Sequence, residues 1–140
     1  MKNISIITDG SCDIPVEVID KYDIKLIPLH FHFEDNIEYG SERMMDSEEF
    51  YRRLANGEIA KTSASSPSSA MYLLKAELDK GNDVICVALS SSLSCTFNNI
   101  RLASLELLDS YPNQRITVID SLSASMAMGM MVIKACMMRD

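Results

Sequence analysis

Short apolar runs alternate with segments of helical periodicity along this chain, and that alternation is the strongest constraint on its fold. We expect strands at 3–8, 24–33, 83–89 and 116–119, the second weakened near Pro28 because proline cannot donate to a strand ladder. A repeated strand–helix–strand order implies right-handed crossovers between parallel neighbours. The predicted fold class is therefore α/β, with a mainly parallel sheet flanked by helices on both faces.

The helices are expected from apolar residues at helical spacing and from residues that are typical of helix starts. Asp13 is the expected cap of the first helix, and Ser66 that of the third. Asp46 and Glu49 have the spacing of a capping box for the second helix. The expected helices begin near Pro15, cover 48–54, run from Pro67 to about Lys80, from about Phe97 to Leu108, and from about Ser123 to Arg139.

Composition excludes several classes of protein. The 140 residues contain 13 Lys and Arg against 20 Asp and Glu, which gives a formal net charge of −7, so a nucleic-acid partner is not expected. We expect one domain, residues 1–140. No run of apolar residues is long enough to span a membrane. The five glycines stand at 10, 40, 57, 81 and 129, too far apart for a dinucleotide or phosphate loop.

The cysteines and histidines predict neither a metal site nor a cofactor. The four cysteines, at 12, 86, 95 and 136, form no CxxC pair, and a reduced cytoplasmic protein is the favoured interpretation. His30 and His32 alternate on one expected strand and could supply only two metal ligands. A half-buried strand position explains them more simply.

Hydroxyl side chains gather where the expected strands end. The segments 9–12, 90–96 and 120–123 follow strands, and 61–66 directly precedes a helix. Ligands of open α/β sheets bind at the carboxyl ends of the strands. The segment 90–96 carries five hydroxyls in seven residues, which together with N–H groups at a helix start suit one carboxylate or phosphate. The alternative is that these serines only cap and turn.

Two further functions stay open from the residues alone. A serine hydrolase acting on a small ester or phosphate would need a histidine base, and only His30 and His32 are present. A protein-interaction domain could use the last helix, where six of the ten methionines lie between 126 and 138. Methionine adapts to irregular apolar shapes, so this helix could also line a pocket or pack in the core. A helix that is apolar all round is expected to be buried.

Six motifs follow one another along the chain, in the order ITDGSCDIP, IPLHFHF, EEFYRRL, KTSASSP, LSSSLSCTFNN and VIDSLSASMAMG. Their order over residues 4 to about 133 resembles the DegV family. The resemblance implies a bacterial cytoplasmic fatty-acid-binding protein without catalytic residues, the binding subunit that presents a long-chain fatty acid to a separate fatty acid kinase for acyl-phosphate formation. It also implies a C-terminal domain that closes the acyl tunnel, which we expect to be absent from this chain.

The resemblance also implies the residues that bind the carboxylate. By position they are Thr62, Ser63, Ser90, Ser91, Leu93 and Ser94, with Leu93 contributing only its backbone. This chain departs from the family pattern at Ala64 and Ser65, which replace Gln and Pro, and at Ser92 and Cys95, which replace two glycines. Loss of those glycines is expected to restrict positive φ values and the approach of the backbone to the head group.

Overall fold

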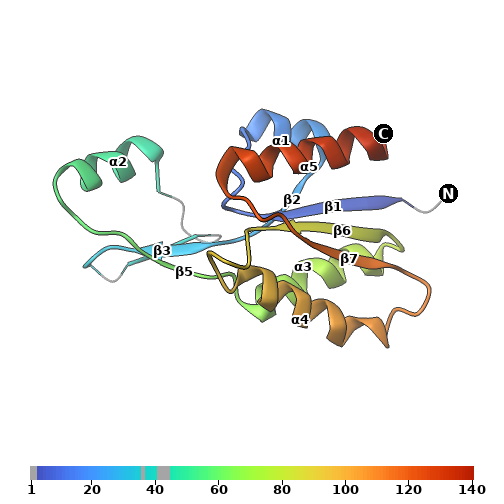
Figure 1. Cartoon of the computed structure of the whole chain (residues 1–140). Helices are drawn as coiled ribbons and strands as arrows, with labels where there is room; N and C mark the ends of the chain where they lie inside the picture. The colour runs from blue at the N-terminus through green and yellow to red at the C-terminus, as the bar shows by residue number, and fades with distance from the viewer. Residues whose placement is uncertain (1–2, 36, 41–44) are drawn as a thin grey trace.

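A four-stranded parallel sheet forms the centre of the molecule (Figure 1). The computed structural model describes residues 3–35, 37–40 and 45–140. The central pair of strands is apolar and buried along most of its length, as expected for a parallel sheet covered on both faces. The strands pair in the order β2 (Lys25–Ile27), β1 (Ile4–Asp9), β6 (Asp83–Ala88) and β7 (Ile116–Asp120).

Helices cover both faces of this sheet, which confirms the predicted fold class (Figure 1). Ile6 and Ile7 are neighbours on β1 and, because side chains alternate along a strand, they enter different cores. Ile7 packs against Leu74 and Ile100, whereas Ile6 packs with Met128. The first core lies beneath α3 (Pro67–Asp79) and α4 (Thr96–Leu108), and the second beneath α1 (Val16–Tyr22) and α5 (Ser125–Arg139).

The expected single strand at 24–33 is wrong, because the chain changes sheets at Pro28. Proline has no N–H for the ladder, and β2 ends at the residue before it. The chain resumes beyond this break in a small antiparallel sheet. That sheet has the order β4 (Glu38–Tyr39), β3 (His30–His32) and β5 (Lys61–Ser63). Neither β4 nor β5 was expected, since both are short and lack an apolar pattern.

One predicted cap is confirmed and one is wrong. The Ser66 hydroxyl accepts a hydrogen bond from the Ser69 backbone N–H at 3.0 Å and so caps α3. Asp13 does not cap α1, which has Pro15 at its N-cap position. Its backbone instead adopts a φ of 50°, and its carboxylate accepts a hydrogen bond from the Ser125 hydroxyl.

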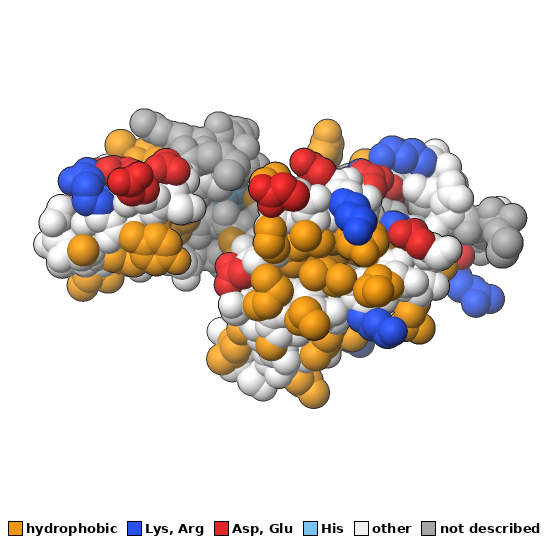
Figure 2. Space-filling model, turned by 90° about the horizontal axis from the view of Figure 1, so that it is seen from above, with side chains coloured by type: hydrophobic (Ala, Val, Ile, Leu, Met, Phe, Trp, Pro, Cys, Tyr) orange, Lys and Arg blue, Asp and Glu red, His pale blue; other side chains and the backbone are white. Residues whose placement is uncertain are grey.

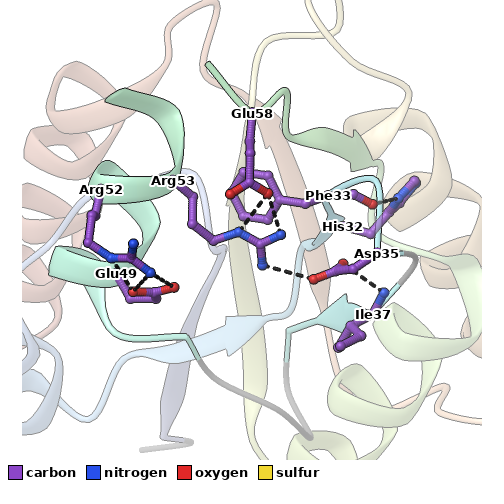
Figure 3. Close-up of polar contacts among 8 residues, drawn as sticks. All are labelled: His32, Phe33, Asp35, Ile37, Glu49, Arg52, Arg53 and Glu58. Carbon is purple, nitrogen blue, oxygen red and sulfur yellow. Dashed lines mark hydrogen bonds and ion pairs between the residues drawn. The ribbon is translucent and has the colours of Figure 1, made fainter. Parts of the chain in front are cut away.

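The capping box at α2 (Ser47–Ala55) is also wrong. Asp46 occupies the N-cap position, but its side chain makes no capping hydrogen bond. Glu49 turns toward Arg52, whose Nε donates to it at 2.8 Å (Figure 3). The ion pair along the helix surface therefore replaces the reciprocal bond that a capping box requires.

The helix α2 has no buried residue. Contacts of individual side chains, rather than a buried core, therefore hold it beside the small sheet. Arg53 donates to Glu58 at 2.9 Å from Nε, pairs with Asp35 at 2.9 Å, and stands 3.9 Å from the centre of the Phe33 ring (Figure 3). The hydrogen bonds that Arg53 donates to Glu58, and then to Asp35, raise the pKa of Arg53 further above its ordinary value. Phe50 adds an edge contact to Phe31 at 5.1 Å between ring centres. We call the contacts of Arg53 with Glu58, Asp35 and the Phe33 ring the Arg53 clamp.

The expectation that the methionine-rich helix is buried is wrong for its outer face. Met128 is fully buried, but the exposed fractions of Met130, Met137 and Met138 are 62%, 59% and 75%. Figure 2 looks onto the face that carries α1 and α5 and shows apolar side chains gathered there. Within the described ranges, no helix combines the length and apolar character that crossing a membrane requires.

Candidate ligand-binding site

A cavity of about 880 Å³ lies between the carboxyl ends of the parallel strands and the small sheet with α2. Its size is within the range of roughly 300–1,000 Å³ that is common for small-molecule sites. Most of the lining is apolar and comes from both sheets. Its principal apolar side chains are Leu26, Leu29, Phe31, Phe50, Leu89 and Leu93.

Most of the predicted carboxylate ligands converge on this cavity. Thr62, Ser63, Leu93 and Ser94 all contribute to the lining. They come from β5 and from the segment between β6 and α4, which lie about 30 residues apart in the chain and meet at the carboxyl end of the sheet. The result is a small polar region within an otherwise apolar cavity.

Ser90 and Ser91 do not contribute to the lining. Ser90 is buried, and its carbonyl accepts hydrogen bonds from the N–H groups of Leu93 and Ser94. The Ser91 N–H donates to the Asp120 carboxylate at 3.1 Å. Both residues therefore shape the loop, whereas Ser94 also lines the cavity.

The backbone N–H groups of this loop are already used within the protein. Leu89 donates to the Asp9 carboxylate at 2.7 Å, and every N–H from 90 to 94 donates to a protein oxygen. Asp9 is fully buried. The expected cradle of amides at residues 90–94 is thus occupied within the protein, and Thr62, Ser63 and Ser94 bring hydroxyl groups to the cavity lining.

Asp120 fixes the other side of the same loop. Hydrogen bonds from the Ser91 side chain, and then from the backbone N–H groups of Leu122 and Ser91, hold the pKa of Asp120 below its ordinary value. The carboxylate is accordingly ionised near neutral pH, and an ionised oxygen makes the stronger acceptor for these N–H groups. The carboxylates of Asp9 and Asp120, at the ends of β1 and β7, therefore anchor the loop between β6 and α4, residues 89–95, which we call the serine-rich loop.

Ser65, considered above only as a departure from the family pattern, connects three segments around the cavity. Its hydroxyl donates to the Pro28 carbonyl at 2.9 Å, and its N–H donates to the Thr96 hydroxyl oxygen at 3.3 Å. The Asn99 side chain donates to the Ser65 carbonyl at 2.9 Å. Thr96 also lies 3.0 Å from the Ser94 hydroxyl. Nothing in the local sequence pattern indicates this long-range role.

The loss of two glycines does not strain the serine-rich loop. Neither Ser92 nor Cys95 has a positive φ, and Cys95 adopts a φ of −72°. A residue with a side chain meets no steric penalty in such a conformation. The expected restriction on the approach of the backbone to the head group stays a prediction.

The two histidines differ in their surroundings. His30 lines the cavity, and its Nδ1 lies 3.5 Å from a carboxylate oxygen of Glu38. His32 lies outside the lining, with its Nδ1 2.9 Å from the Phe33 carbonyl oxygen (Figure 3). The interpretation of both histidines as half-buried strand residues did not predict that His30 lines the cavity. Among the residues with described positions, no cluster of three metal-ligating side chains occurs.

The parallel sheet, its two helical layers and a largely apolar cavity at the carboxyl ends of the strands define an α/β domain of a class in which small-molecule sites are common. The model of the DegV family, described as uncharacterised proteins, matches residues 3–140. This chain belongs to the DegV family.

The relatives and solved structures agree with that assignment. A DegV domain-containing protein from Clostridium perfringens is 34% identical over 96% of this chain and 47% of its own length. A DegV lipid-binding protein from Thermotoga maritima is 32% identical with a TM-score of 0.82, covering 99% of this chain and 48% of that protein. DegV from Bacillus subtilis, a fatty acid binding protein, is 30% identical with a TM-score of 0.82 and the same coverage. The chain spans about half the length of these relatives.

Proposed function

We propose that this chain binds a long-chain fatty acid, with the carboxylate at the hydroxyls of Thr62, Ser63 and Ser94 and the acyl chain in the apolar cavity. The observation that carries the proposal is the convergence of these residues, from distant segments, on one largely apolar cavity. Similar proteins are described as fatty acid binding or lipid binding, which supports the same ligand class.

The proposed division of labour follows from the sizes of the two contributions. Burying about 14 methylenes at roughly 0.8 kcal/mol each contributes on the order of 11 kcal/mol before the costs of association. Neutral hydrogen bonds contribute about 0.5–1.5 kcal/mol each. The acyl chain therefore supplies most of the affinity, and the hydroxyls fix where the head group lies.

Ser90, Ser91 and the Leu93 backbone have a different part in this proposal. They hold the loop that places Ser94, through the Ser90 carbonyl and the anchor at Asp120. Direct contact between Ser91 and the ligand would require the loop to release that carboxylate. We accordingly expect Ser94 to contribute more to ligand binding than Ser91.

The finer role is a carrier in the cytoplasm rather than an enzyme. In this proposal residues 1–140 form a single α/β domain that holds the fatty acid and presents its carboxyl group to a separate kinase. A second domain, of the kind the DegV resemblance implies, closes the opposite side of the acyl chain. The few polar residues in an otherwise apolar lining support a ligand with one polar head group on a long apolar chain.

Native mass spectrometry of the full-length protein, together with its thermal shift in palmitate, tests the proposal. We expect a co-purified acyl chain and a higher unfolding temperature with palmitate. T62V and S94A are expected to reduce both effects, whereas S92A, in the same loop but outside the cavity lining, leaves them unchanged. Absence of any bound acyl chain together with no shift in palmitate would overturn the proposal.

A further inference from the structure

His30 lies next to the hydroxyl groups of the cavity. It is on β3, where its Cα is paired with that of Ser63 on the antiparallel strand β5. Directly opposed residues project from the same face, with Cβ atoms about 4.5–5.5 Å apart. Both residues line the cavity. The imidazole therefore belongs to the polar region in which the fatty acid carboxylate is proposed to lie.

Gly40 leaves the room that this ring occupies. A Cβ atom at Gly40 would lie 1.9 Å from His30 Cδ2 and 2.8 Å from His30 Nε2, far inside van der Waals contact. The backbone of Gly40 does not have the positive φ that favours glycine. Glycine is thus required here by the space of the imidazole and not by the backbone conformation.

Glu38 faces the same ring. Its carboxylate is 3.5 Å from Nδ1 of His30, from the strand on the opposite side of β3 to Ser63. In an imidazolium both ring nitrogens are donors, so Nε2 can serve a ligand while Nδ1 faces Glu38.

Other ionisable side chains near this position come from several elements. Asp13 and Tyr51 line the same cavity, from the segment after β1 and from α2. Lys61 on β5 is paired with His32 and is therefore two positions further along the strand pair than Ser63, outside the cavity lining. Among the cavity-lining side chains whose positions the structure describes, His30 is the one on the small sheet that can carry a positive charge.

We propose, building on the proposed fatty-acid function, that His30 is a specificity residue that selects a carboxylate head group over an uncharged one. Hydroxyls of the Ser and Thr type donate hydrogen bonds to a carboxylate and to an alcohol alike. An imidazolium adds a charge-assisted hydrogen bond only when the ligand is an anion. The hydroxyls place the head group, and His30 distinguishes its charge.

The test compares palmitate with hexadecan-1-ol, which has the same chain length and no charge, by equilibrium binding to the full-length protein near pH 6.5. H30Q is expected to weaken palmitate binding about tenfold or more, the scale of a lost charged hydrogen bond, and to change alcohol binding by less than about threefold. H32Q is the matched control on the same strand, outside the cavity lining, and keeps both affinities.

G40A provides a second, independent variant. The new Cβ displaces the imidazole while the backbone accepts alanine, so the preference for palmitate is expected to fall as in H30Q. An unchanged ratio of palmitate to alcohol affinity in H30Q, or an equal loss in H32Q, would overturn the assignment of His30. If the unsubstituted protein binds neither ligand, the fatty-acid function itself is wrong and this inference falls with it.

Discussion

The two sheets of this molecule are stabilised in different ways. The parallel sheet has apolar side chains buried on both faces, with Ile6 and Ile7 fully buried in separate cores. The small sheet has strands of two or three residues, and α2 beside it has no buried residue. Buried area stabilises the first region, whereas an aromatic cluster and the Arg53 clamp stabilise the second.

This difference matters because the cavity lies where the two regions meet. Leu89, Leu93 and Ser94 belong to the loop that two carboxylates anchor to the parallel sheet, while Phe50 comes from α2. The cavity is thus firmly held on the side of the parallel sheet and weakly held on the side of α2. On the proposed function, this arrangement allows a long apolar ligand to enter without disrupting the main core. The predictions below test that contrast.

The largest effect is expected from truncation of the main core. I7A is expected to lower the free energy of unfolding by about 2–5 kcal/mol, since it leaves a cavity among fully buried side chains. F50A, on α2, is expected to cost less because the Phe50 ring is only partly buried. Urea denaturation measures both variants, and an equal or larger loss for F50A would contradict the proposed difference between the sheets.

A local effect is expected from the Arg53 clamp. R53A removes the contacts to Asp35, Glu58 and the Phe33 ring, so amide hydrogen exchange should accelerate within α2 while the parallel strands keep their protection. R52A is the matched control, because Arg52, within the described part of the chain, pairs with Glu49 on its own helix and not with the small sheet. Accelerated exchange throughout the parallel sheet in R53A would show that the two regions unfold as one.

The smallest effect is expected at the boundary between the two regions. S66A removes the hydroxyl that caps α3 just after β5, and is expected to cost about 1 kcal/mol of unfolding free energy. S68A, an exposed neighbour within the first turn, should change stability by less than about 0.5 kcal/mol. Thermal unfolding distinguishes the pair, and equal stabilities would mean that the cap at Ser66 contributes nothing.

Prediction from sequence succeeded where the determinants are local. Apolar runs located the four parallel strands, and Ser66 with Pro67 marked the start of α3. It failed where a long-range partner decides the outcome, because Asp13 bonds to Ser125 and not to its own helix. The change of sheet at Pro28 was not predicted for the same reason, since the partner strands of the small sheet are distant in sequence.

The candidate site divides in a similar way. The family motif indicated Thr62, Ser63 and Ser94, which do line the cavity. It did not separate them from Ser91, because only the folded chain shows that Asp120 accepts the Ser91 N–H. The position of His30 in the cavity was not predicted, since a histidine in a strand gives no sign of the space that Gly40 leaves for its ring.

An electron-density map of the full-length protein crystallised with palmitate tests the central claim most directly. The account predicts a carboxylate within hydrogen-bond distance, about 2.5–3.2 Å, of the hydroxyls of Thr62, Ser63 or Ser94, with the acyl chain in the cavity and the Ser91–Asp120 contact intact. A carboxylate bound at Ser91 after that contact opens, or an acyl chain located outside the cavity, would contradict it.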